Sequence, residues 1–226
     1  MKIKHLALVQ DSGNQEYYTD EAIISRVKRV LGVIDLDPAS NPLANETVGA
    51  VTFFTKSDDG LSRDWHDKVF MNHPFGKGEN ACNRYLKDGK GHKKGDYNCK
   101  KRICNDPKYA HYRGHHIDVD IPSNLDWVQH LESQFNKGNV TEAINIAFAE
   151  LSSSWGQILT NGVYCIPNER VNYYQYNPEK QALVKDRGVT KGSILRYWGN
   201  NPDEFAKVFS EIGTVHQPYN IKSGGL

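Results

Sequence analysis

The strongest constraint on the fold is a series of short apolar runs, each followed by polar residues, in the first third of the chain. Thr19-Asp20-Glu21 opens an amphipathic segment that Gly32 closes, and its apolar side chains recur at helical spacing. Three apolar runs of strand length follow, at residues 33–37, 51–54 and 68–71, with a short helix expected at 41–50. Strands that alternate with helices predict an α/β fold with a parallel, doubly wound sheet.

The rest of the chain continues this alternation. The expected helices and strands are residues 126–138, 143–148, 162–166, 193–198 and 202–212, the first and last being helical. No run approaches membrane-spanning length, and Leu6-Ala7-Leu8-Val9 is too short for the core of a signal peptide. We therefore expect a cytoplasmic protein with no membrane partner, in which residues 1–226 form a single domain. Its four cysteines are expected to be thiols or metal ligands.

The tetrapeptide Asn72-His73-Pro74-Phe75 directly follows the third apolar run. An amide, a prolyl turn and an aromatic ring at the end of a buried strand suit a grip on a nucleobase amine. The side-chain oxygen of Asn72 and the carbonyl of His73 would accept the two amine hydrogens, and Phe75 would stack on the ring. The same residues also fit an ordinary turn, because Asn bonds to its own backbone and Pro fixes φ.

Polar residues also follow the first two predicted strands. Asp37 and the turn Pro38-Ala39-Ser40 come after the first, and Asp58 and Asp59 lie in the turn after the second. Because the carboxyl ends of parallel strands meet at one edge of a sheet, we expect these residues near Asn72, as a small-molecule pocket requires. Asp58 and Asp59 fit a plain solvated turn equally well.

Basic charge is concentrated in a segment that we interpret as an insertion, residues 77–120. The whole chain has a formal net charge of +1, whereas the stretch from Lys77 to His116 contains 11 Lys and Arg against 4 Asp and Glu. Such a segment is suited to contact nucleic-acid phosphates, with a solvated basic loop as the alternative. The candidate contacts are Lys100, Lys101, Arg102 and Arg113.

Cysteine and histidine cluster in the same insertion. A tetrahedral structural zinc would order a segment that has too few apolar residues to order itself. The candidate ligands are Cys82, Cys99, Cys104 and His111, with His115 or His116 as an alternative fourth ligand. Their spacing is not that of a standard zinc finger, so a mobile loop with incidental thiols is the other interpretation. Cys165 lies in a predicted strand and is expected to be a small core residue.

Several separate motifs resemble, in order, those of the phage-type Dam DNA methyltransferases, which act on the amino group of adenine. They are Tyr17-Tyr18-Thr19, residues 34–40, Phe54-Thr55 with Asp58-Asp59-Gly60-Leu61, Trp65-His66 ahead of the tetrapeptide, and residues 138–143, 170–174 and 190–193. The resemblance covers roughly four fifths of the chain and leaves out the insertion from 77 to about 120.

This resemblance implies a Rossmann-like methyltransferase fold with a mostly parallel central sheet, S-adenosylmethionine as methyl donor and double-stranded DNA as substrate. It implies that Asn72, His73, Pro74 and Phe75 form the catalytic motif. The implied cofactor contacts are Tyr18, Thr19, Asp37, Pro38, Ala39, Ser40, Asp58 and Asp59. We therefore expect a site-specific adenine methyltransferase that flips its target base out of the duplex. The chain lacks a glycine-rich G-x-G at the first cofactor motif.

His73 stands where the family usually has a proline. The change has three interpretations: a tolerated substitution, a contact to substrate or a neighbouring side chain, or altered or lost catalysis. Two alternatives to adenine methylation follow. One is a catalytically silent DNA-binding protein on the same fold, and the other is an enzyme that modifies a different base, such as cytosine at its amine. The oligomeric state and the recognition sequence do not follow from these residues.

Overall fold

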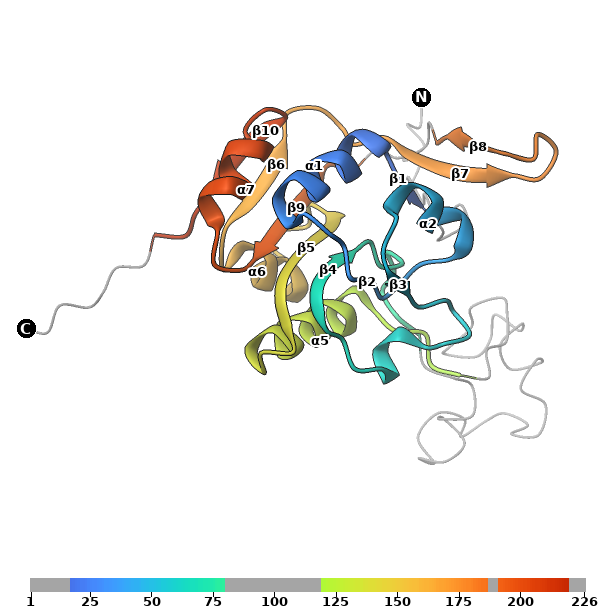
Figure 1. The fold of residues 1–226 in the computed structure, drawn as a ribbon, viewed down its shortest axis with the longest axis horizontal. Coiled ribbons are helices and arrows are strands. Elements are labelled where there is room, and N and C mark those ends of the chain that lie inside the picture. The colour runs from blue at the N-terminus through green and yellow to red at the C-terminus, as the bar shows by residue number, and fades with distance from the viewer. Residues whose placement is uncertain (1–16, 80–118, 187–190, 220–226) are drawn as a thin grey trace, which may run out of the picture. The chain divides into compact units, whose positions relative to one another are not determined.

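The computed structural model describes residues 17–79, 119–186 and 191–219 (Figure 1). The chain divides into two compact units, one formed by Met1–Phe75 with Trp127–Leu226 and the other by Gly76–Asp126. The predicted insertion at residues 77–120 lies inside the second unit. All the residues predicted to bind zinc or DNA lie outside the described residues: Cys82, Cys99, Lys100, Lys101, Arg102, Cys104, His111, Arg113, His115 and His116.

Helix α1 (Glu21–Leu31) forms where the sequence predicts it. The Asp20 side chain accepts a hydrogen bond from the Ala22 amide and caps the N-terminus, at 3.0 Å. Gly32, at φ 76°, ends the helix and donates its amide to the Lys28 carbonyl. The buried face is the predicted one, Ile23, Ile24, Val27, Val30 and Leu31.

Four parallel strands form one half of a seven-stranded sheet. In spatial order these are β3 (Thr52–Phe53), β2 (Leu36–Asp37), β4 (Asp67–Met71) and β5 (Val140–Phe148). Helix α2 (Pro42–Val48) connects β2 to β3, and α5 (Asn124–Asn136) precedes β5. Each strand lies within or around the apolar run that predicted it, and the first two strands are shorter than expected.

Three antiparallel pairings complete the sheet. Strand β9 (Ser193–Trp198) pairs with β5, β6 (Tyr164–Pro167) pairs with β9, and β10 (Gly213–His216) forms the far edge. The sheet is therefore mixed, and the predicted parallel arrangement holds only from β3 to β5. The fold is α/β, and this topology is compatible with a Rossmann-like fold.

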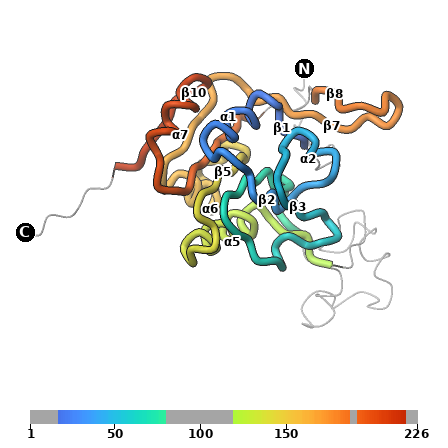
Figure 2. The backbone as a smooth tube through the Cα atoms, in the orientation of Figure 1, coloured from blue at the N-terminus to red at the C-terminus, as the bar shows by residue number. Residues whose placement is uncertain are grey.

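Helices cover the sheet on both sides. Helices α1 and α7 (Pro202–Phe209) contact each other, and their buried side chains join those of β4, β5 and β9 in one core cluster. Figures 1 and 2 show α5 and α6 (Ser154–Thr160) on the other side of the sheet. Cys165 in β6 is fully buried, and burial raises the pKa of its thiol to about 12. Its prediction as a core residue is confirmed.

The structure also contains a separate three-stranded antiparallel sheet, which the sequence did not predict. It consists of β1 (Tyr18–Thr19), β7 (Tyr173–Asn177) and β8 (Ala182–Lys185), with Tyr18 opposite Tyr174 and Thr19 opposite Tyr173. This pairing joins residues from opposite ends of the sequence, so no local pattern predicts it. Helix α6, strand β10 and the short 3-10 helix η1 (Gly60–Ser62) were also not predicted.

In the second unit, the two ends of the predicted insertion run antiparallel to each other. Glu79 and Ile121 exchange backbone hydrogen bonds of 2.9 and 2.8 Å. The Asn124 amide donates to the Gly76 carbonyl at 3.0 Å, and the Asn124 side chain accepts from the Gly76 amide at 3.1 Å. The two ends of the predicted insertion are therefore hydrogen-bonded to each other.

Over the described parts of the chain, no helix is both long enough and apolar enough to cross a membrane.

Candidate functional site

The order in which strands are added to the sheet reverses between β2 and β4. The chain runs from β2 to β3 on one side, then returns to the other side of β2 to form β4, and β5 adds beyond β4. Open α/β sheets bind ligands at the carboxyl ends of strands that flank such a reversal. Asp37 is the last residue of β2, and Asn72 is the first residue after β4. Two of the predicted site residues therefore flank this switch point.

The amide of Asn72 is held in one orientation. Its Nδ2 donates to the Tyr17 carbonyl at 2.8 Å and to the Thr19 hydroxyl oxygen at 2.9 Å. A backbone carbonyl can only accept, so the nitrogen and not the oxygen must face Tyr17. The remaining atom, Oδ1, is buried and has no hydrogen-bond partner among the described residues. A buried acceptor without a donor is costly and is a feature of functional sites.

Phe75 lies in a group of aromatic rings. Its ring stacks on that of Tyr17 with centroids 6.1 Å apart, and its centroid is 4.3 Å from that of Phe148 at the end of β5. The fully buried Tyr173 of β7 meets Phe75 edge-on at 5.9 Å. Tyr17, Phe75 and Phe148 are each only partly buried, so together they form an aromatic surface beside Asn72. Pro74 is exposed.

His73 is buried beside this aromatic surface, and its ring meets that of Phe75 edge-on with centroids 5.5 Å apart. The ring is 1% exposed, and its Nδ1 lies 3.3 Å from Nδ2 of Asn145, a fully buried residue of β5. The ring also stacks against Trp127 of α5, at 6.3 Å between centroids and 24° between planes. Of the three interpretations of His73, the structure contains the contact to a neighbouring side chain.

Asp37 is an acidic group enclosed by the protein. Its side chain is 3% exposed, and burial raises its pKa to about 7. A hydrogen bond from the Ala39 amide, at 3.2 Å, acts in the opposite direction and lowers the pKa. A carboxyl group with this pKa changes charge near neutral pH and responds strongly to a nearby cation.

The turns after β2 and β3 lie against each other, as the sequence predicts. The Ser40 amide donates to the Phe54 carbonyl at 2.8 Å. Gly60 approaches the Pro38 carbonyl so closely that a Cβ added to Gly60 would lie 2.1 Å from the oxygen. Only glycine permits this contact. The Trp127 ring also lies next to Gly60. Its nearest carbon would be 3.5 Å from a Cβ added to that glycine.

Strand β1 joins the two turns of the site. Thr19 contacts Asn72, as described above, and the Tyr18 hydroxyl accepts from Nδ2 of Asn41, the N-cap residue of α2, at 3.2 Å. Tyr18 and Thr19 are both buried. These predicted cofactor contacts are therefore structural neighbours of both Asn72 and the turn that follows β2.

Asp58 and Asp59 have the properties of turn residues. Oδ2 of Asp58 accepts from the Thr55 hydroxyl at 2.6 Å and from the Thr55 amide at 2.8 Å, and these bonds lower the pKa of Asp58. Asp59 is exposed, and its backbone adopts a positive φ of 53° before η1. These features favour the solvated-turn interpretation of both residues.

Sequence reasoning missed Tyr17, Trp127, Asn145 and Phe148 as members of this neighbourhood. Asn145 offered a signal, because it is the one polar side chain inside the predicted strand 143–148. A polar residue buried in a strand needs hydrogen-bond partners and is a candidate for a specific role. The other three are aromatic residues that equally suit an ordinary core.

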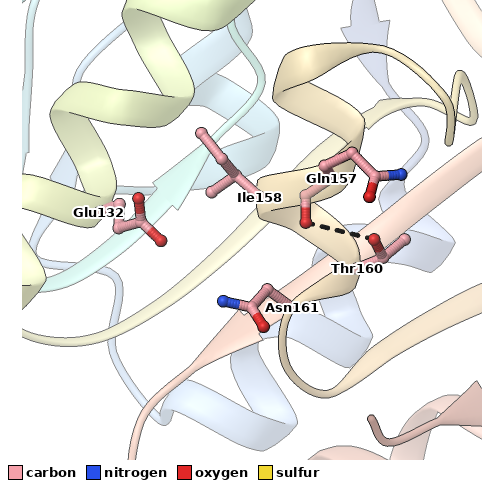
Figure 3. A pocket seen from close by; sticks show the side chains of 5 residues that line it. All are labelled: Glu132, Gln157, Ile158, Thr160 and Asn161. Carbon is pink, nitrogen blue, oxygen red and sulfur yellow. Dashed lines mark hydrogen bonds between the residues drawn. The ribbon is translucent and has the colours of Figure 1, made fainter.

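A pocket elsewhere in the same unit contains none of the predicted site residues. Figure 3 shows Glu132 of α5 facing Gln157, Ile158 and Thr160 of α6, with Asn161 at the C-terminus of that helix. Among the described residues, no group of three or more His, Cys, Asp or Glu side chains is arranged to hold a metal ion.

No family model matches the chain, and neither a curated protein nor a solved structure matches it.

Proposed function

We propose that the protein is a DNA methyltransferase that transfers a methyl group from S-adenosylmethionine to the exocyclic amine of adenine. The observation that carries this proposal is the Asn72 amide. Its nitrogen is committed to Tyr17 and Thr19, and its buried oxygen has no donor among the described residues. An amine that binds there would supply the missing donor. The resemblance of the surrounding motifs to the Dam family supports adenine as the target.

The aromatic surface beside Asn72 suits a flipped base. A purine inserted against Phe75 and its neighbours Tyr17 and Phe148 would gain stacking energy on a sequence-tolerant surface. Asn72 Oδ1 and the carbonyl of His73 would then accept the two amine hydrogens. Two fixed acceptors draw the nitrogen lone pair out of conjugation and hold it in line for transfer.

Asp37 is the residue that we assign to the cofactor. S-adenosylmethionine supplies an electrophilic methyl group on a sulfonium, and its amino-acid part bears an ammonium. That ammonium would favour the ionised form of the Asp37 carboxyl group, whose pKa burial raises to about 7. The turn that follows Asp37 contains Pro38, Ala39 and Ser40, and strand β1 with Tyr18 and Thr19 lies next to it. Asp58 and Asp59 have no contact that requires a cofactor role.

The direct test is to incubate the protein with unmodified duplex DNA and S-adenosylmethionine labelled in the methyl group. The DNA is digested to nucleosides, and the labelled nucleoside is identified by mass. We expect N6-methyladenosine in its deoxy form. If the label is found on N4-methylcytosine, the acceptor is cytosine and not adenine. If the protein binds DNA but transfers no label, it is a catalytically silent DNA-binding protein.

A matched pair of variants connects the activity to the site. Asn72→Ala removes the proposed acceptor, and Asn161→Ala removes an exposed Asn that lines the pocket in Figure 3. We expect only the first to lose methylation. The opposite result would move the site to the α5 and α6 pocket.

A further inference from the structure

The ammonium group of Lys191 lies beside the aromatic surface. Its Nζ is 5.4 Å from the centroid of the Phe148 ring, and that ring is 4.3 Å from the ring of Phe75. A cation at this distance from a ring is attracted to its face. The Gly192 carbonyl accepts from the Ala149 amide at 2.8 Å, so the backbone next to Lys191 is bonded to the residue that follows β5. A positive charge is therefore held next to the proposed base-binding surface.

The partner of this ammonium can be exchanged. Lys191 donates a hydrogen bond to the Glu150 carboxylate and forms an ion pair with it. The two side chains are 57% and 45% exposed. Ion pairs in contact with water contribute only about 0–1 kcal/mol, so another anion can take the place of Glu150 at little cost. A phosphate group, with several acceptor oxygens, is a strong hydrogen-bond partner for a lysine.

The proposed substrate brings a phosphate to this place. A nucleotide that has been flipped out of a duplex carries a backbone phosphate on each side of its sugar. If its base stacks on Phe75 and Phe148, the sugar and the phosphates project beyond the rings toward solvent. The Lys191 ammonium is the exposed positive charge that the structure places against these rings.

We propose that Lys191 binds a backbone phosphate of the nucleotide whose base enters the site. In the protein without DNA, Glu150 pairs with the ammonium, and the phosphate replaces the Glu150 carboxylate when DNA binds. This contact lies outside the basic insertion, to which the sequence assigned the phosphate contacts. The inference rests on the proposed function for the identity of the ligand and on the contacts of Lys191 for the position of the charge.

The salt dependence of DNA binding tests the phosphate contact without any need for methyl transfer. Lys191→Met removes the charge and keeps an apolar side chain over Phe148. We expect duplex DNA to bind roughly 3- to 10-fold more weakly at 100 mM salt, and the slope of log K against log salt to fall by about one. Glu150→Gln removes the competing carboxylate and should strengthen binding. An unchanged slope in Lys191→Met would overturn the proposal.

Lys207→Met is the matched control. Lys207 is also an exposed lysine paired with a glutamate, Glu204, but it lies on α7, which contains no candidate site residue. We expect native affinity and a native slope for this variant. Equal losses in Lys191→Met and Lys207→Met would mean that general charge, and not a contact at the site, determines binding.

Two small probes test whether the phosphate belongs to the nucleotide in the site. Deoxyadenosine 3′,5′-bisphosphate carries both flanking phosphates, and deoxyadenosine carries none. Titration of the native protein, followed by NMR, should show tighter binding of the bisphosphate, and Lys191→Met should abolish most of the difference. If the bisphosphate binds no better than the nucleoside, Lys191 does not contact the flipped nucleotide.

The outcomes separate this contact from the proposed function. If the native protein transfers no methyl group but Lys191→Met has the smaller slope and loses the preference for the bisphosphate, methyl transfer fails and the phosphate contact stands. If the native protein methylates DNA and Lys191→Met retains the native slope, only the phosphate contact fails. In an active enzyme, Lys191→Met should raise the KM for DNA with kcat nearly unchanged, because the contact is equal in the ground state and the transition state.

Discussion

The parallel and antiparallel halves of the seven-stranded sheet differ in the buried polar side chains that they contain. In the parallel half, strands β2, β4 and β5 bring Asp37, Asn72 and Asn145 to the region of the switch point. In the antiparallel half, β6 and β9 bury Cys165, Ile194 and Leu195. The parallel half holds the candidate site residues together with fully buried apolar residues such as Phe70 and Ile144, whereas none of the described candidate site residues lies on β6, β9 or β10.

Unsatisfied polar atoms support this difference. Within the described residues, Asn72 Oδ1, Asn145 Oδ1 and Trp127 Nε1 are buried without partners in or beside the parallel half. Each such atom costs roughly 1–3 kcal/mol. The antiparallel half has the Nε atom of Arg196, but the same guanidinium donates to the Val163 and Tyr197 carbonyls and stacks over Trp198. The guanidinium therefore has hydrogen-bond partners at Nη1, and burial lowers its pKa to about 10.

The largest expected effect on stability comes from a cavity in the antiparallel half. Leu195→Ala removes a fully buried side chain of β9 and should lower the free energy of unfolding by about 2–5 kcal/mol. Urea titration followed by circular dichroism measures this loss. At low temperature, where the variant remains folded, turnover per folded molecule should match the native protein. A large loss of turnover in the folded variant would contradict the separation of the two halves.

Asn72→Ala should lower turnover strongly and stability only slightly, the reverse of Leu195→Ala. We expect turnover to fall by roughly 10²- to 10³-fold, because one preorganised polar group is lost from the site. The free energy of unfolding should change by only about 1 kcal/mol, since two hydrogen bonds disappear together with an unsatisfied oxygen. Single-turnover methylation and urea titration provide the two numbers. Normal turnover would remove Asn72 from the proposed mechanism.

Asp37 should make the stability of the native protein depend on pH. Between an unfolded pKa of about 4 and the folded pKa of about 7, the folded state holds a proton that the unfolded state has lost. The Asp37 contribution is therefore complete below pH 4 and is lost as the pH rises through 7, a decline of a few kcal/mol.

The measurement is the difference in unfolding free energy between the native protein and Asp37→Asn from pH 4 to pH 8. We expect this difference to fall with pH. Under the proposed function, affinity for S-adenosylmethionine should instead rise through pH 7, because the ammonium pairs with the ionised carboxylate. A flat difference would show that Asp37 is ionised throughout and that burial does not control its charge.

Gly60→Ala should produce the smallest of these effects. The new Cβ would lie 2.1 Å from the Pro38 carbonyl oxygen, so the turns after β2 and β3 must move apart at a cost of about 1–3 kcal/mol. Thermal unfolding measures the cost, and calorimetry should show weaker binding of S-adenosylmethionine. Gly192→Ala is the matched control, because its nearest neighbour, Ala149 Cβ, is 3.9 Å away. Equal behaviour of the two variants would mean that the turn contact is dispensable.

Elements specified by neighbouring residues could be predicted from the sequence. The Asp20 cap, the apolar spacing and Gly32 define α1 within a few residues, and short apolar runs located β4, β5, β6 and β9. Strand β1 has only two residues and no periodicity, and it exists because it pairs with β7 across the length of the chain. The antiparallel half of the sheet depends on similar long-range pairings.

The candidate site was predictable to the same extent. Asp37 and Asn72 follow apolar runs, so their positions at strand ends could be inferred. The direction of the His73 side chain could not be inferred, because it depends on contacts with Asn145 and Trp127, which are distant in sequence. The turn role of Asp58 depends on the hydroxyl of Thr55, and the motif alone does not distinguish this role from a cofactor contact.

The anchoring of Asn72 on Tyr17 and Thr19 has a consequence for the timing of protein synthesis. Thr19 and Tyr18 lie in β1, which pairs with Tyr173 and Tyr174 of β7. During translation, residue 72 leaves the ribosome long before residues 173 and 174 are made, so the strand that supports its anchor forms late. A nascent chain would contain Asn72 without its anchor on β1, and the candidate site would be complete only when β7 has paired with β1.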